Sequence, residues 1–130
     1  MSRGGIRSQT VENKAVGLGG NEFETGSIIV QAGATIPAGA VLKRGYSGIF
    51  ELVTNLASDT PVAINPFDIP NTDPTGHGIQ ASMRAIIFGR VRADMLNING
   101  NPVTAPKDFD KIRANTLCIP IATNDISFTE

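Results

Sequence analysis

The chain has 130 residues, of which 41% are hydrophobic and 18% charged, and its formal net charge is −1. This composition excludes an intrinsically disordered protein, and a nearly neutral chain gives no bulk attraction to nucleic acid or to an acidic membrane. The single cysteine, Cys118, excludes an intrachain disulfide and a cysteine-rich zinc site, and its apolar surroundings in TLCIPI predict a buried thiol.

The residue bias predicts a mainly β protein. The chain has 15 Ile, 8 Val and 11 Thr but only 6 Leu, together with 14 Gly and 8 Pro. β-branched residues favour strands, and glycine and proline separate short strands by turns. No apolar run follows the cations of MSRGGIRSQT, and none approaches the roughly 18 residues of a membrane span, so we expect a soluble protein made in the cytoplasm.

Residues 1–22 are predicted to form a flexible N-terminal arm, followed by a single β-rich domain over residues 23–130. The arm is polar and contains five glycines, so it buries too little apolar surface to order itself. Part of the arm alternates weakly and would pair as a strand with the sheet edge of a partner; an inert tail is the alternative. The candidate partner contacts are Thr10, Val11, Glu12, Asn13, Lys14, Ala15 and Val16.

Short strands and turns follow up to residue 65. Apolar and β-branched runs predict strands over 26–33, 35–45, 48–54 and 61–65. The Gly-rich stretch AGATIPAGAVLKRG, residues 32–45, contains the second run and raises the question of a phosphate-binding loop. Such a loop needs its glycines before a helix and a Ser or Thr after the Lys. Here Arg44 follows Lys43 and no helical period comes after, so we expect two extended pieces joined by a turn at Pro37 and Gly39.

Two loops flank the longest predicted strand, residues 82–96. The loop 66–78 contains three prolines and the only histidine, His77. No neighbouring Ser, Cys or carboxylate pattern supports a catalytic or metal-binding role for His77, so we expect an exposed side chain. The loop 97–106 contains an Asn-Gly pair, which is typical of a β-hairpin turn.

The strand 82–96 has one face on which arginines surround apolar residues. A basic strand with an aromatic residue also occurs in nucleic-acid platforms, but those combine several aromatics with positive charge, and this chain has no Trp and no basic excess. We therefore interpret this face as an inter-subunit surface on which Arg heads reach carboxylates or water. Its candidate contacts are Ile86, Phe88, Arg90 and Arg92.

The C-terminal part predicts one short helix and a last strand. In TAPKDFDKIRAN, Thr104 would cap the helix and Pro106 suits its first turn. The stretch 116–129 closes with a strand, and Pro120 within it favours a position at the edge of a sheet.

In this order the elements resemble the lambda-type head decoration proteins of tailed bacteriophages. The stretches that carry the resemblance are IPAGAVLKRG, PVAIN, FGRVRADML and DFDKIRANTLCIPI, and it covers residues 26–121. The resemblance implies a flexible arm before a compact domain of short strands, β-barrel-like or β-clip-like, with one short helix. It also implies a structural protein that binds as a homotrimer to the outside of the expanded head in the virion and clamps neighbouring subunits of the major capsid protein.

No catalytic constellation is evident, because the chain has one His, one Cys and carboxylates without pairing. We therefore expect no enzymatic activity, no cofactor and no metal, and no direct contact with nucleic acid or membrane. Two alternatives to a decoration protein stay open. One is another β-rich structural protein of a virion, such as a fibre base or a minor head protein. The other is a small β-rich module that binds a sugar or nucleotide, or an enzyme fragment.

Overall fold

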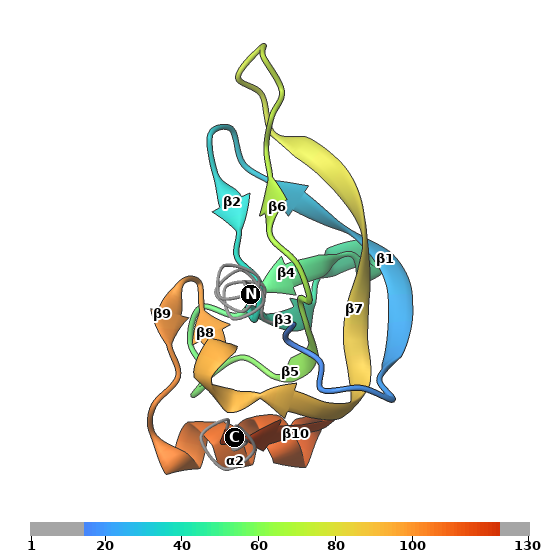
Figure 1. The fold of residues 1–130 in the computed structure, drawn as a ribbon. Coiled ribbons are helices and arrows are strands. Elements are labelled where there is room, and N and C mark those ends of the chain that lie inside the picture. Colours follow the sequence, from blue (N-terminus) through green and yellow to red (C-terminus); the bar gives the residue numbers. More distant parts are fainter. Residues whose placement is uncertain (1–14, 123–130) are drawn as a thin grey trace, which may run out of the picture.

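A closed barrel of five strands forms the centre of residues 15–122, the part of the chain that the computed structural model describes (Figure 1). Each strand pairs with the next, and the last strand closes the barrel by pairing with the first. In order around the barrel the strands are β1 (Glu22–Val30), β4 (Phe50–Leu52), β3 (Val41–Arg44), β5 (Pro61–Ile64) and β7 (Ile79–Arg92). The prediction of a mainly β, barrel-like domain with one helix is confirmed.

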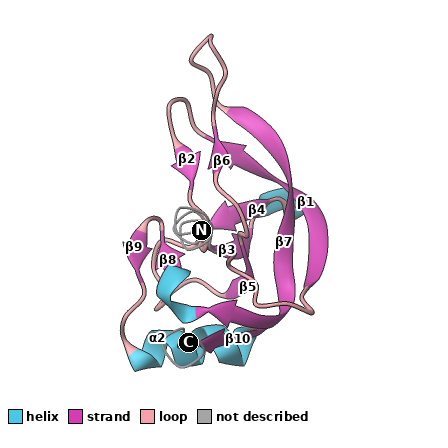
Figure 2. Ribbon diagram, in the orientation of Figure 1, coloured by secondary structure: helices cyan, strands magenta, loops and turns pink. Residues whose placement is uncertain are grey.

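Shorter elements extend the barrel in two directions (Figures 1 and 2). Beyond one end, β2 (Thr35–Ile36) pairs with β6 (Ile69–Pro70). Towards the other end lie the hairpin of β8 (Asn97–Ile98) and β9 (Asn101–Pro102), the helix α2 (Pro106–Asn115) and the strand β10 (Leu117–Ile121). Two 3-10 turns complete the set, η1 (Tyr46–Gly48) and η2 (Ala93–Met95). None of the described helices has the length and apolar character needed to cross a membrane.

Two apolar clusters fill the molecule, because adjacent residues of the central strands face opposite sides. A row across β3, β5 and β7, formed by Val41, Ile64 and Ile86, packs in one cluster with the buried residues of α2 and β10. The neighbouring positions Leu42 and Ala63 belong to the second cluster, together with buried residues of β1 and β4. Strands that are covered on both sides carry apolar residues at consecutive positions.

β7 is the longest strand, as predicted, but a β-bulge interrupts its alternation. Phe23 pairs with Ile86 whereas Glu22 pairs with Phe88, so Ile87 is an extra residue. Ile86 is also the residue at which β7 meets β5, and its side chain is buried in the row described above. The prediction that grouped Ile86 with exposed inter-subunit residues is therefore wrong, because pairing on both edges of β7 places it inside the domain.

α2 packs against β10, and β10 pairs with β7. The helix begins at Pro106, as the sequence indicated, but Ala105 rather than Thr104 occupies the N-cap position, and no side chain caps it. β10 runs parallel to β7 and is the last strand of the sheet, so the edge position predicted from Pro120 is confirmed. The N–H of Cys118 is bonded to the hydroxyl of Thr116 at 3.0 Å, and Pro120 has no N–H.

The described chain begins against β7. Val16 is buried, and its carbonyl accepts a hydrogen bond of 2.8 Å from the N–H of Arg92. Gly17 forms a bridge with Val91. Residues 16–21 thus contact the folded domain, although the sequence prediction placed them in the arm. The rest of the predicted arm, residues 1–14, lies outside the described residues.

Candidate interaction surfaces

Both ends of the described chain lie beside the same residue of β7. On one edge of the strand Arg92 bonds to Val16, and on the other edge it pairs with Ile121 of β10. Neighbouring strands lie about 4.8 Å apart, so the points at which residues 1–14 and 123–130 join the domain are about 10 Å apart. Contacts made by either terminal segment therefore start from one end of the sheet.

An apolar patch lies next to these chain ends, on the outward face of β7 and β10. Phe88 pairs directly with Leu117, and the exposed fractions are 43% for Phe88, 67% for Leu117 and 44% for Ile119. The surface around them is hollowed to about 530 Å³ and also includes Arg90 and Arg113. We call these five residues the β7–β10 patch. Large apolar side chains that lie together on an exposed sheet are typical of an interaction surface.

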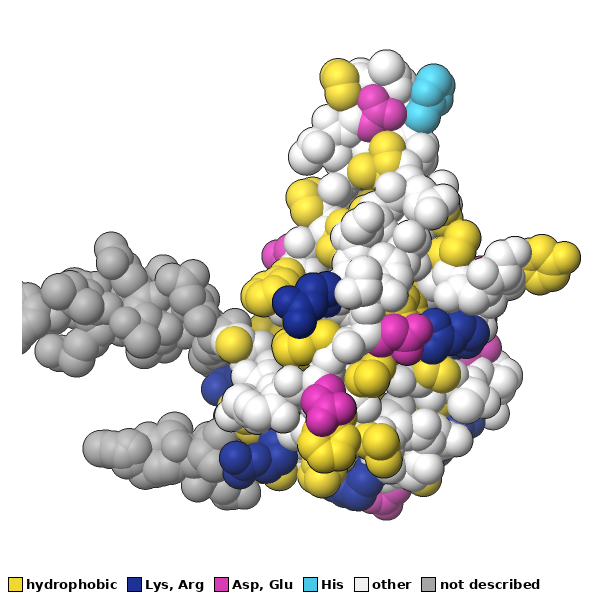
Figure 3. Space-filling view, turned by 90° about the vertical axis from the view of Figure 1, so that its right-hand side faces the viewer, with side chains coloured by type: hydrophobic (Ala, Val, Ile, Leu, Met, Phe, Trp, Pro, Cys, Tyr) yellow, Lys and Arg dark blue, Asp and Glu magenta, His cyan; other side chains and the backbone are white. Residues whose placement is uncertain are grey.

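The patch carries two arginines, of which one is paired with a carboxylate. Arg113 is bonded to Asp110 at 2.9 Å, whereas no carboxylate of the described residues contacts Arg90. Arg92 bonds to Asp94 at 3.2 Å, and its Nε is buried without a hydrogen-bond partner among residues 15–122. Viewed from the side of β1 and β7, hydrophobic side chains are intermixed with both basic and acidic side chains over the lower half of the molecule (Figure 3). This chemistry suits a partner that is both apolar and acidic.

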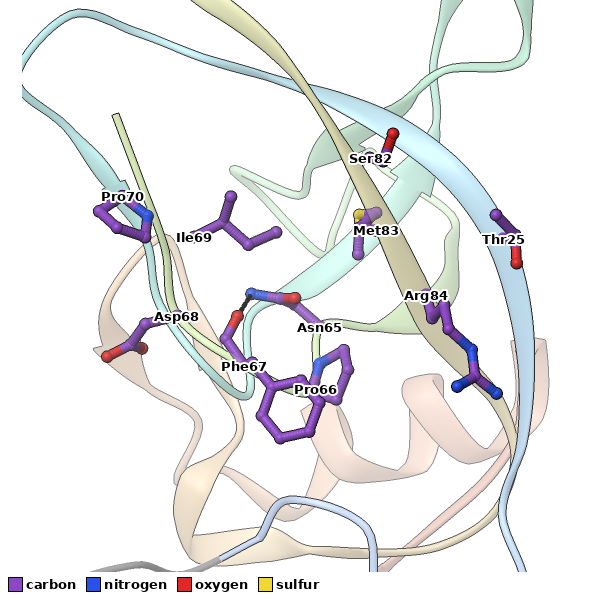
Figure 4. Close-up of a pocket in the computed structure, with 10 residues that line it drawn as sticks. All are labelled: Thr25, Asn65, Pro66, Phe67, Asp68, Ile69, Pro70, Ser82, Met83 and Arg84. Atoms are coloured by element: carbon purple, nitrogen blue, oxygen red, sulfur yellow. Dashed lines mark hydrogen bonds between the residues drawn. The ribbon is translucent and has the colours of Figure 1, made fainter. Parts of the chain in front are cut away.

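A second apolar surface, the Phe67 groove, lies where the barrel wall is not closed by hydrogen bonds (Figure 4). β5 pairs with β7 only at Ile64 and Ile86, and beyond this point residues 65–70 run beside β7 without pairing to it. The groove has a volume of about 510 Å³ and is mostly apolar. Met83 and Ile69 contribute to its lining, and Phe67 stands at its rim with 70% of its surface exposed.

The wall of the groove is fixed by one buried amide. The Nδ2 of Asn65 donates to the carbonyl of Phe67 at 2.7 Å, to that of Pro37 at 2.9 Å and, more weakly, to that of Ile36 at 3.4 Å. Figure 4 shows the bond between Asn65 and Phe67. Nearby, Asp68 accepts a hydrogen bond of 2.7 Å from the N–H of Ala38. The loop that carries Phe67 is therefore held in place without a bound partner.

Arg84 lies at the opposite side of the groove. Its guanidinium stacks over the ring of Phe23, at 4.7 Å from the centroid, which is a cation–π contact. No carboxylate among the described residues pairs with Arg84. The guanidinium therefore keeps hydrogen-bond donors for a partner while its orientation is held by the aromatic ring.

His77 is exposed, as predicted, and lies at the tip of the protruding loop (Figure 3). Its Nδ1 is 3.1 Å from the hydroxyl of Thr75, which in turn contacts the carboxylate of Asp73 at 2.8 Å. The backbone N–H of Thr75 is the main cause that holds the pKa of Asp73 below its usual range. These three side chains bond to one another at a solvated loop tip and do not face a cavity, so the arrangement stabilises the turn and offers no enclosed site for chemistry.

The remaining titratable candidates are engaged within the domain. Lys43 bonds to Asp59 at 3.2 Å, and the guanidinium of Arg44 makes a bidentate interaction with the carboxylate of Glu24, with hydrogen bonds of 2.9 and 3.0 Å. The cations at the end of the Gly-rich stretch therefore face carboxylates. Cys118 is buried, as predicted, and burial raises the pKa of its thiol. Within residues 15–122 no three His, Cys, Asp or Glu side chains gather as metal ligands.

Some of the contact residues predicted from the sequence lie at the surface, and others are buried or lie outside the described residues. The segment Thr10–Lys14 lies outside the described residues, Ala15 is exposed, and Val16 is buried. Among the inter-subunit candidates, Phe88 and Arg90 lie together in the β7–β10 patch. Ile86 is buried and Arg92 is half-buried.

Sequence reasoning missed two sets of surface residues. Leu117 and Ile119 lie in a run, LCIPI, in which every residue is apolar, so alternation could not tell the exposed face from the buried one. Phe67 lies between Pro66 and Asp68 in a stretch that was interpreted only as a loop. A large aromatic residue next to a proline in a polar loop is the signal that would have identified it.

Comparisons with known proteins add no assignment. A scan against protein-family models, a search of curated proteins and a search of solved structures each found no match to this chain. The function is therefore argued from the two surfaces and the sequence.

Proposed function

We propose that this chain is a structural decoration protein of a tailed-phage head. In this proposal it binds as a homotrimer to the outside of the expanded capsid and stabilises the shell through contacts with the major capsid protein. Its task is mechanical, so it needs no cofactor and performs no catalysis. Binding at several points at once gives high avidity from individually weak contacts.

The observation that carries the proposal is the β7–β10 patch. Phe88, Leu117 and Ile119 form an outward apolar surface on a small barrel whose two core clusters are already complete. An interface at this position would bury these side chains and bring the chain ends of neighbouring copies close together. Residues 1–14, whose predicted contacts include Thr10–Lys14, would then leave a trimer from one region and reach the shell as a group.

Shell binding tests the proposal directly. Purified protein is mixed with unexpanded and expanded shells of the cognate major capsid protein, the shells are pelleted, and the bound copies are counted. We expect saturable binding to expanded shells at a fixed copy number and little binding to unexpanded shells. Equal binding to both forms, or none to either, would contradict a decoration role.

The role of the patch is tested by a matched pair of variants. Ile119→Ser removes an exposed apolar side chain from the patch, whereas Ile29→Ser removes one of nearly equal exposure, 42%, from β1. We expect the first variant to lower the trimer fraction measured by light scattering and the second to leave it unchanged. Equal behaviour of the two variants would remove the patch from the interface.

The proposed role of the N-terminal segment requires a deletion that respects the buried position of Val16. Removal of residues 1–14 should leave the thermal transition unchanged, because Val16 and Gly17 keep their contacts with β7. The same deletion should weaken binding to expanded shells by at least about tenfold, which corresponds to two or three lost hydrogen bonds per copy. Undiminished binding would assign shell contact to the folded domain alone.

A further inference from the structure

We propose that the Phe67 groove is the docking site for an extended segment of the capsid protein, in which an apolar side chain and a carboxylate occupy adjacent positions. This inference rests on the proposed function and names the surface and the segment chemistry that the folded domain uses. The juxtaposition that carries it is a free strand edge, an apolar groove and an arginine without a carboxylate partner.

The first element is the edge of β7 that faces the groove. From Ile79 to Ala85, β7 pairs with β1 along one edge. On the other edge it meets β5 only at Ile86 and pairs with β10 from Phe88 onwards. No described strand pairs with the second edge between Ile79 and Ala85, so its outward N–H and C=O groups are available to an added strand.

The second element is the preformed apolar lining. Met83 and Ile69 lie across the groove from one another, with Phe67 at the rim (Figure 4). The hydrogen bonds of Asn65 and the fixed φ angle of Pro66 hold this rim in place. A groove that is already formed loses little conformational entropy on binding, and a volume of about 510 Å³ is within the usual range of concave sites.

The third element sets which two kinds of residue are adjacent in the partner. Met83 is directed inward and nearly buried, whereas the next residue, Arg84, is exposed. Adjacent residues of an added strand also point to opposite faces. A segment that directs an apolar side chain towards Met83 therefore directs its neighbour towards Arg84, where a carboxylate would meet the stacked guanidinium.

The terminal segments of this chain are weaker occupants. Eight residues, 123–130, follow Ala122 and span at most about 28 Å. Along β7, Arg84 is eight residues from Arg92, about 26 Å, and Arg92 pairs with the end of β10. Residues 123–130 of the same chain would thus need nearly their full extended length to reach the groove and would leave almost no residues to occupy it. Residues 1–14 are long enough to reach the groove, and cross-linking distinguishes them from a segment of the capsid protein.

A photo-crosslinker at the rim tests the proposal. Benzoylphenylalanine is introduced at position 67 of the full chain, and at position 46 as a control, because Tyr46 is a still more exposed aromatic residue on η1. The proteins are bound to expanded shells, irradiated and analysed by mass spectrometry. We expect position 67 to cross-link to a capsid-protein segment with an apolar-acidic pair, and position 46 to give no cross-link to that segment.

Surface variants supply an independent measurement. Arg84→Glu should weaken binding to expanded shells by at least tenfold, Arg84→Lys should retain most of the affinity, and Lys107→Glu on α2 should bind as wild type. Arg84 and Lys107 are both at the surface, and the trimer fraction of each of the three variants should remain unchanged. A lower trimer fraction for Arg84→Glu would place the groove in the copy–copy interface and overturn the proposal.

The outcomes separate the two proposals. If wild-type protein does not bind expanded shells, the decoration role fails and the groove assignment fails with it. If wild-type protein binds but Arg84→Glu binds equally well, only the groove assignment fails. A cross-link from position 67 to residues 1–14 or 123–130 of another copy also overturns it, because the occupant would then be this chain itself.

Discussion

The buried amide of Asn65 gives the sharpest test of how the groove is built. Asn65 is 1% exposed, and its Nδ2 faces the carbonyls of Phe67, Pro37 and Ile36. An amide carries two N–H donors, so two of these bonds are full and the longest, to Ile36, is weak. Asn65→Ala removes both donors; the carbonyl of Pro37 keeps its bond of 3.2 Å from the N–H of Ala40, and the carbonyl of exposed Phe67 can turn to water.

The expected loss follows from these contacts. Each of the two lost bonds contributes about 0.5–1.5 kcal/mol, so Asn65→Ala should lower the free energy of unfolding by about 1–3 kcal/mol. For a domain of this size the transition temperature should fall by about 5–10 °C. Urea unfolding followed by circular dichroism measures both values. A loss below about 0.5 kcal/mol, the range of ordinary surface changes, would refute the reasoning.

Asn65→Asp is the companion variant, because it keeps the shape and replaces the donor by an acceptor. Its introduced carboxyl would face carbonyl oxygens in a buried position, which disfavours the ionised form and raises the pKa above the unfolded value. The destabilisation should therefore be largest at pH 7 and decrease as the pH falls through the raised folded pKa. An equal destabilisation at pH 7 and pH 4.5 would show that the carbonyls do not set the energetics of this position.

Three further outcomes follow from the described residues. Gly39 has φ +85°, and an added Cβ would clash with a backbone carbonyl, so Gly39→Ala should abolish stable folding. Gly33→Ala, at φ +72° in open space, should cost only about 1–2 kcal/mol; similar effects of both would contradict this. Because Cys118 is buried, which also raises the pKa of its thiol, its alkylation should be much slower in native protein than in urea, and native labelling as fast as in urea would argue against burial. The hydrogen bond from the backbone N–H of Thr54 is the main cause that lowers the pKa of Asp59. Asp59→Asn should therefore be less stable than wild type at pH 7, and this difference should disappear as the pH falls from about 4 through the lowered folded pKa. A difference in stability that does not depend on pH would exclude this bond as its source.

Local signals were sufficient for the elements that depend on neighbouring residues. The Asn-Gly pair in the loop 97–106 forms the turn between β8 and β9, where Asn99 and Gly100 both have positive φ. Pro120 lies on an edge strand, and the apolar neighbours of Cys118 do bury it. In each case the chemistry of a few adjacent residues decides the conformation.

The features that the sequence did not predict correctly depend on contacts between distant parts of the chain. Ile86 was assigned to an exposed face because its sequence neighbours alternate, but its burial follows from simultaneous pairing with β1 and β5. The Phe67 groove depends on where residues 65–70 leave β5, and on an amide that contacts carbonyls 28 and 29 positions away along the chain. Periodicity within one segment carries no information about such pairing.

The outer edge of β10 decides which kinds of assembly are open to this protein. The hydroxyl of Thr116 occupies the N–H of Cys118, and Pro120, two positions further on, has none to donate, so an approaching strand finds no ladder to extend there. Copies that meet at this face therefore pack side chain against side chain, and such an interface gives a ring only if its rotation closes. Edge-to-edge strand pairing, the contact from which fibres grow, finds no continuous ladder along this edge. The hydroxyl of Thr116 and the ring of Pro120 thereby disfavour edge-to-edge growth along β10.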